Sequence, residues 1–130
     1  MSTTLDGLAL AASLTVADIE KSLAWYRDVL GFAVDRKHER EGQLRAVSLK
    51  AGAVQILISQ DNGAKGSDRA KGQGLSLQIT TAQNIDEIAT RIKARGGVLE
   101  SDPVDGFGAR VFRLLDPDGF KLVISSERKS

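Results

Sequence analysis

Residues 14–32 read LTVADIEKSLAWYRDVLGF, a stretch that predicts the end of a strand followed directly by one amphipathic helix. Upstream, residues 8–16 alternate apolar and polar side chains, which is typical of a strand with one buried face. Asp18 has the chemistry of an N-cap, and Gly31 stands where a helix would end. Between them, apolar side chains recur at helical spacing: Ile19, Leu23, Tyr26 and Leu30.

Three strand-like runs follow this helix, near residues 33–37, 44–49 and 53–59. The second half of the chain then repeats the same order. Residues 74–80 alternate, and Asn84 followed by Glu87 has the spacing of a capping box. The second helical stripe consists of Ile85, Ile88 and Ile92, and it ends at Gly96 and Gly97. Strands are predicted after it near residues 98–100, 110–115 and 120–125.

A shift of 66 positions pairs Ile19 with Ile85 and Ile58 with Ile124, so the chain contains two copies of one unit. A period this long with two copies indicates a duplicated module and not a solenoid. We predict a single domain of residues 1–130 in the α+β class, with βαβββ modules at residues 8–60 and 74–126. The segment 61–73 is rich in Gly and Lys without periodicity, and we expect it to be a linker.

The bulk composition narrows the possible functions. A formal net charge of +1 gives no electrostatic reason to expect a nucleic acid or a membrane as partner. No apolar run approaches the roughly 20 residues that span a bilayer. The chain has no cysteine, which excludes disulfides and thiolate chemistry and agrees with a cytoplasmic location.

The paired βαβββ order, the stretch LTVADIEKSLAWYRDVLGF, the later GFGARVF and the final DPDGFKLVI together resemble the vicinal oxygen chelate superfamily. That superfamily includes glyoxalase I, the bleomycin-resistance proteins and the extradiol dioxygenases. The resemblance spans roughly residues 8–126. It implies two four-stranded sheets that curve into a partly open barrel, with the helices outside and a ligand cleft inside. It also implies a homodimer.

In the metal-dependent members, each module offers one His, Glu or Gln ligand from its first strand and one from its last. The matching first-strand positions here are Ala11 and Gly74. The last-strand positions are Val123 and either Leu57 or, with a register slip of two, Gln55. A lone Gln cannot hold a divalent ion, which needs several converging ligands. We therefore expect neither a metal nor another cofactor.

The DPDG sequence of residues 116–119 ends in a strand, and its two acidic residues suggest either a metal site or a turn. Pro fixes φ, Asp side chains bond nearby backbone groups, and Gly permits a positive φ. The turn is therefore the simpler interpretation, because the resemblance places the metal-binding acid further along, at Val123.

Strand alternation supplies the candidate cleft. The apolar faces, which include Leu10 and Leu75, are expected to lie beneath the helices, and the opposite faces are small and mildly polar. Those faces line either a cleft or only a solvated sheet. With Phe107 as an apolar lid contact or an edge-packing residue, the candidate cleft consists of Ser13, Thr15, Gln55, Leu57, Ser76, Gln78, Phe107, Arg113 and Val123.

The charged candidates each have a second interpretation. Arg113 points inward if Phe112 and Leu114 face the helix, and it would then bind a carboxylate or phosphate, but it is otherwise an exposed edge residue. Arg45 occupies the same strand of the first module. His38 lies in the polar run DRKHEREGQ and is predicted to be an exposed loop residue, or else an acid–base group at the cleft mouth.

These residues favour a metal-independent protein that binds a small molecule, for example by sequestering an antibiotic or a metabolite. The alternative is a lyase, isomerase or dioxygenase-like enzyme that acts on a small anionic substrate through Arg113, Gln78 or His38. A third possibility is a structural or regulatory domain with a vestigial cleft. The sequence names neither the ligand nor the reaction, and it does not decide whether a dimer exchanges modules.

Overall fold

The computed structural model describes residues 4–6, 8–63 and 74–127, so most of the predicted linker lies outside the described residues. The elements of the N-terminal module are β1 (Ala11–Val16), α1 (Ile19–Ala24), the π-helical turn η1 (Trp25–Val29), β2 (Ala33–Arg40), β3 (Gln43–Ala51) and β4 (Val54–Gln60). Those of the C-terminal module are β5 (Ser76–Thr81), α2 (Ile85–Ala94), β6 (Leu99–Gly106), β7 (Ala109–Leu115) and β8 (Lys121–Ser126). The tandem βαβββ order and the α+β class are confirmed.

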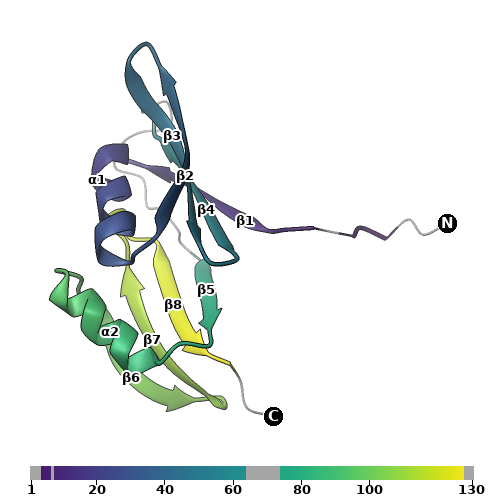
Figure 1. Cartoon of the computed structure of the whole chain (residues 1–130), viewed down its shortest axis with the longest axis vertical. Helices are drawn as coiled ribbons and strands as arrows, with labels where there is room; N and C mark the ends of the chain where they lie inside the picture. Colours follow the sequence, from purple (N-terminus) through teal and green to yellow (C-terminus); the bar gives the residue numbers. More distant parts are fainter. Residues whose placement is uncertain (1–3, 7, 64–73, 128–130) are drawn as a thin grey trace.

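Each module builds its own four-stranded mixed sheet, in the order β1-β4-β3-β2 or β5-β8-β7-β6. The first strand of each module runs parallel to the last strand, and the other pairs are antiparallel. The two sheets are not closed into a barrel. Both helices lie on the same side of the molecule, each against its own sheet, and α2 also contacts η1 across the module boundary (Figure 1).

The helix boundaries follow local chemistry. Asp18 accepts a hydrogen bond from the backbone N–H of Lys21, and Asn84 accepts one from the N–H of Glu87. These side chains satisfy donors that the first helical turn leaves without a partner. Gly31 and Gly96 follow the two helices with φ angles of 85° and 91°, values that other residues adopt only at a cost. No helix in the described part of the chain is long and apolar enough to cross a membrane.

The core forms where the helix-facing rows of the sheets meet the apolar stripes of the helices. Strand register pairs Leu14 with Ile58 and Leu122 with Leu114, so apolar side chains stack row on row. The large side chains buried most completely are Tyr26, Phe112, Leu49, Ile56, Ile58, Leu114 and Leu122. The predicted alternation of faces is therefore correct within the strands.

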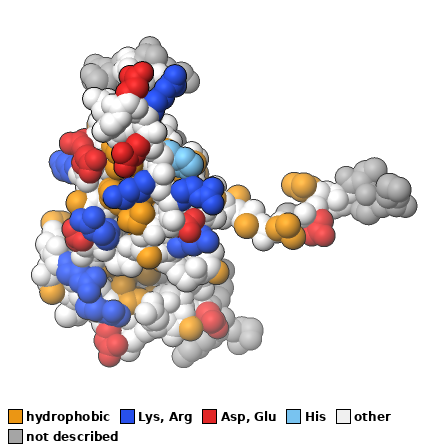
Figure 2. Space-filling view, turned by 45° about the horizontal axis from the view of Figure 1, so that its top comes forward, with side chains coloured by type: hydrophobic (Ala, Val, Ile, Leu, Met, Phe, Trp, Pro, Cys, Tyr) orange, Lys and Arg blue, Asp and Glu red, His pale blue; other side chains and the backbone are white. Residues whose placement is uncertain are grey.

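At the strand ends the sequence prediction is wrong. Leu10 and Leu75 were expected in the core, but their exposed fractions are 92% and 55%. The reason is register: β1 begins at Ala11 and β5 at Ser76, so neither leucine has a neighbouring strand beside it. The N-terminal arm, residues 4–6 and 8–10, instead extends away from the body and carries hydrophobic side chains into solvent (Figure 2). Its leucines, Leu5, Leu8 and Leu10, are each at least 92% exposed.

The corner at residues 116–119 is a turn, as expected, and it also joins the two modules. The N–H of Gly119 donates to the carbonyl of Asp116, and Gly119 has a φ of 95°. Asp116 accepts a 2.8 Å hydrogen bond from the hydroxyl of Tyr26, in the other module. Asp118 accepts hydrogen bonds from the N–H of Ala17, at 2.9 Å, and the hydroxyl of Ser22, at 3.3 Å. The acidic residues of this corner therefore tie α1, η1 and the residue before α1 to the turn between β7 and β8.

Candidate functional site

Each sheet has one face beneath its helix and a second face turned away from it, called here the open face. The predicted cleft residues fall on the open faces but in two separate groups. Ser13, Thr15, Gln55 and Leu57 lie on the N-terminal sheet, where Ser13 pairs with Leu57. Ser76, Gln78, Arg113 and Val123 lie on the C-terminal sheet. The structure brings together the members of each group, and the two groups stay on different sheets.

The open face of the N-terminal sheet carries a chain of polar contacts. The Gln55 amide donates to the Ser48 hydroxyl at 3.0 Å, and that hydroxyl donates to Asp35 at 3.4 Å. The Lys50 ammonium lies 3.8 Å from the other carboxylate oxygen of Asp35. The alternation of β3 could have indicated Ser48 and Lys50. The contact of Asp35 with Ser48 depends on a bulge in β2, and no sequence pattern predicts that bulge.

His38 belongs to this same face, which corrects its assignment to a loop. It lies within β2, because β2 and β3 continue as a long hairpin beyond the predicted strand ends. Strand register places His38 beside Ala46, Ala46 beside Ser59, and Ser59 beside Thr15. Paired residues point to the same side of a sheet, so the imidazole shares the open face with the predicted cleft residues. His38 is exposed, as expected.

On the C-terminal sheet, one row crosses all four strands and contains Gln78, Val123, Arg113 and Ser101. Phe112 and Leu114 are fully buried on the helix side, so Arg113 points to the open face, as its predicted parity requires. Val123 is only 8% exposed. The Ser101 hydroxyl is buried and has no hydrogen-bond partner among the described residues. Such a group is uncommon in native proteins, and strand register places Ser101 directly opposite Arg113.

Phe107 and Arg45 lie apart from these rows. Phe107 occupies the turn between β6 and β7 with a φ of 51°, and its side chain is 90% exposed. The edge-packing interpretation of Phe107 is therefore wrong, since it has almost no contact with its own chain. Arg45 is exposed on β3.

The residues at the inferred metal positions do not fit a metal ion. Leu57 and Val123 project from the open faces, as ligands would, but their side chains carry only carbon. Ala11 and Gly74 have no donor side chain either. Among the residues that the structure describes, no three His, Cys, Asp or Glu side chains gather in one place. Even with Gln55 in place of Leu57, the four positions offer a divalent ion only one donor side chain, which is too few to hold it.

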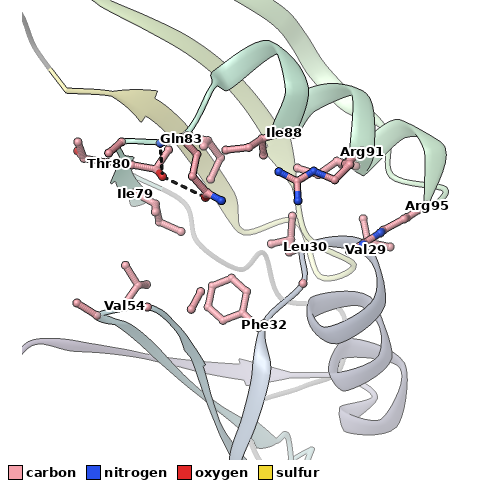
Figure 3. A pocket seen from close by; sticks show the side chains of 18 residues that line it. Val29, Leu30, Phe32, Val54, Ile79, Thr80, Gln83, Ile88, Arg91 and Arg95 are labelled. Carbon is pink, nitrogen blue, oxygen red and sulfur yellow. Dashed lines mark hydrogen bonds between the residues drawn. The ribbon is translucent and has the colours of Figure 1, made fainter.

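A groove of about 710 Å³ lies elsewhere, between the two modules (Figure 3). It is bordered by the end of η1, the turn between β3 and β4, the end of β5 and one side of α2. None of the predicted cleft residues lines it. Sequence reasoning missed this groove because it exists only when the two modules pack together.

Comparison with known proteins adds independent information. The family model described as the Glyoxalase/Bleomycin resistance protein/Dioxygenase superfamily matches residues 7–124. A probable lactoylglutathione lyase of Vibrio cholerae serotype O1 is 26% identical over 129 residues, which cover 93% of this chain and 91% of the relative. The lactoylglutathione lyase of Salmonella typhimurium is 26% identical over 121 residues, or 87% of each chain.

Solved structures show the same fold. TioX from Micromonospora sp. ML1 superposes with a TM-score of 0.73 at 20% identity, covering 92% of this chain and 98% of its own. A superfamily member from Sphaerobacter thermophilus superposes with a TM-score of 0.71 at 25% identity, covering 94% and 98%.

Proposed function

The chain belongs to the glyoxalase/bleomycin resistance protein/dioxygenase superfamily, and we propose that it is a member that binds a small organic molecule without a metal ion. One observation carries this proposal. The scaffold is kept, but the positions that would hold the ion are Ala11, Gly74, Val123 and either Leu57 or Gln55, and a lone Gln cannot hold a divalent ion. In metal-assisted chemistry, the bound ion stabilises the charge that develops in the transition state, a contribution of several kcal/mol. The side chains at these positions cannot hold that ion.

The open faces suit a compact ligand with a few polar groups. Leu57 and Val123 provide apolar contact, while Gln55, Gln78 and Arg113 provide directional hydrogen bonds. This mixture is typical of small-molecule sites, in which apolar lining gives affinity and a few polar groups fix orientation. Sequestration of an antibiotic or a metabolite is the proposed role, and the cytoplasm is the proposed compartment.

We propose a homodimer as the working form, supported by the N-terminal arm. Leu5, Leu8 and Leu10 are almost fully exposed, and none of the described residues buries them. Three apolar side chains on one extended segment are unfavourable in water unless a partner covers them. A second copy would cover them and could bring two open faces together. Light scattering on the wild type and on a Leu5→Ser, Leu8→Ser, Leu10→Ser variant tests this: the wild type should be dimeric and the variant monomeric.

The binding proposal is tested by native mass spectrometry of the protein as purified, without added metal. We expect a metal-free protein that carries a stoichiometric small-molecule adduct. Arg113→Gln should lose the adduct, and the matched variant Arg45→Gln, on the corresponding strand of the other module, should keep it. A stoichiometric divalent ion, or an adduct equally retained by both variants, would contradict the proposal.

A second candidate function is a metal-independent lyase or isomerase acting on a small anionic substrate. It is favoured by the 26% identity to lactoylglutathione lyases and by the place of His38 on an open face. The two functions separate in a lactoylglutathione lyase assay run with and without added Zn²⁺ or Ni²⁺. The binding protein should show no turnover in either case. Turnover that disappears in His38→Gln would identify the enzyme.

A further inference from the structure

We propose that the groove between the two modules is a second binding site, for a small amphipathic molecule with an anionic head group and an apolar body. The groove is distinct from the rows of candidate cleft residues and shares with the open face only its edge at Thr80, near the end of β5. Ile79 and Ile124 line it from the helix side of the C-terminal sheet, whereas their neighbours Gln78 and Val123 point to the opposite side. Its volume of about 710 Å³ falls in the range of roughly 300–1,000 Å³ that is usual for small-molecule sites.

The apolar part of the groove comes from both modules. Phe32 and Val54 line it from the N-terminal module and face Ile79 of the C-terminal module (Figure 3). Leu30, at the end of η1, lies between this apolar region and α2. An apolar ligand body placed here would leave water on contact with Leu30, Val54 and Ile79, which the protein itself only half buries.

The polar part of the groove is cationic. Arg91 lies on α2 and Arg95 is its C-cap, four residues further on, so both side chains extend from the same side of the helix into the groove lining. Neither guanidinium forms an ion pair or hydrogen bond with any described residue. The hydrogen bonds from Arg27 and, less strongly, the charge of Arg95 lower the pKa of Asp28, and both oxygens of that carboxylate already accept from Arg27, at 2.8 and 3.0 Å. Like charges at this spacing repel, and a bound anion would relieve that repulsion.

A third donor is held in position beside them. The Thr81 hydroxyl accepts a hydrogen bond from the backbone N–H of Gln83, at 3.1 Å, and donates one to the side-chain oxygen of Gln83, at 3.2 Å. This arrangement leaves the amide nitrogen of Gln83 as the free end of the side chain (Figure 3). No Asp or Glu is among the described residues that line the groove. The charged side chains that line the groove are therefore all cationic, which favours an anion over a cation.

The head group that fits two guanidiniums and an amide is a carboxylate or a phosphate. Isothermal titration calorimetry with decanoate and with decyl phosphate distinguishes these two, and 1-decanol tests the need for charge. We expect one-to-one binding of at least one anionic probe, at least about tenfold tighter than decanol, and weakened by salt. Arg91→Gln combined with Arg95→Gln should weaken binding by about tenfold or more, while Arg45→Gln should leave it unchanged.

Ala82→Trp keeps both arginines but places an indole at the rim, and it should block the probe. Equal affinity for decanol and the anions, no effect of the double arginine variant, or no binding of any probe would overturn the proposal. A dimer that Ala82→Trp abolishes would also overturn it, because the groove would then be an interface between two copies. Failure here leaves the open-face proposal intact, since Arg113 and its row are unchanged in these variants.

Discussion

Replacing Tyr26 by Phe should loosen the contact between the two modules. The Tyr26 hydroxyl donates to Asp116 at 2.8 Å, across 90 residues of sequence, and both side chains are buried. The other Asp116 oxygen already accepts from the N–H groups of Asp118 and Phe120, at 2.9 and 2.8 Å. Without Tyr26, one oxygen of a buried carboxylate therefore has no donor among the described residues.

The expected loss of stability in Tyr26→Phe follows from the cost of leaving one Asp116 oxygen buried without a donor. A hydrogen bond to a charged partner is worth about 1.5–3 kcal/mol, and an unsatisfied buried acceptor costs a similar amount. We expect a loss of about 2–3 kcal/mol in the free energy of unfolding at pH 7. With an unfolding entropy of about 2.1 cal/mol/K per residue, that corresponds to a decrease in Tm of roughly 7–11 °C.

Urea denaturation at pH 7 and at pH 3 measures this loss. Protonation removes the charge on Asp116, so the cost of Tyr26→Phe should be clearly smaller at pH 3. Ser22→Ala is the control, because its longer bond, 3.3 Å to Asp118, leaves that carboxylate with the N–H of Ala17 as a donor. A loss below about 0.5 kcal/mol for Tyr26→Phe, or equal losses for the two variants, would refute the reasoning.

Three further predictions concern stability, each measured by urea denaturation. Gly97→Ala should cost about 1–3 kcal/mol, because the new methyl group would clash with the Ile92 side chain, whereas Gly106→Ala, with nothing within 4 Å, should be nearly neutral. Asn84→Ala should cost about 1 kcal/mol through loss of the α2 N-cap, and a Ser in its place should restore most of the loss. Burial raises the pKa of Asp116 above its usual value, despite the opposing hydrogen bonds from Tyr26 and the backbone. Because the pKa is raised in the folded state, the wild type loses stability as the pH rises through that pKa. The free energy of unfolding of Asp116→Asn should therefore increase relative to that of the wild type between pH 3 and pH 7. If the difference between the two proteins is the same at both pH values, the sign of the pKa shift is contradicted.

The turn at residues 116–119 shows how a family motif can have a structural use without a metal. Asp116 accepts from Tyr26 in η1, and Asp118 accepts from Ser22 in α1 and from the backbone of Ala17 just before it. The corner therefore sets how the second module sits on the first, and with it the shape of the groove between them.

The sequence by itself determined the two modules, their helix boundaries and the two faces of each strand. Asp18, Asn84 and Gly31 act on groups a few residues away, and the alternation of strands is a local geometric period, so no distant contact is needed to predict them. The absence of ligand side chains at Ala11 and Val123 also follows from the sequence once the strands are aligned.

The tertiary structure alone decided the rest. The β2 bulge brings Asp35 to Ser48, and the length of the β2–β3 hairpin places His38 on the open face. Leu10 is exposed because no strand lies beside it, which its own pattern cannot reveal. The bond between Tyr26 and Asp116 and the groove beneath Arg91 both join segments far apart in sequence. Such contacts depend on the position of one module relative to the other, and that position is set by packing and not by any local period.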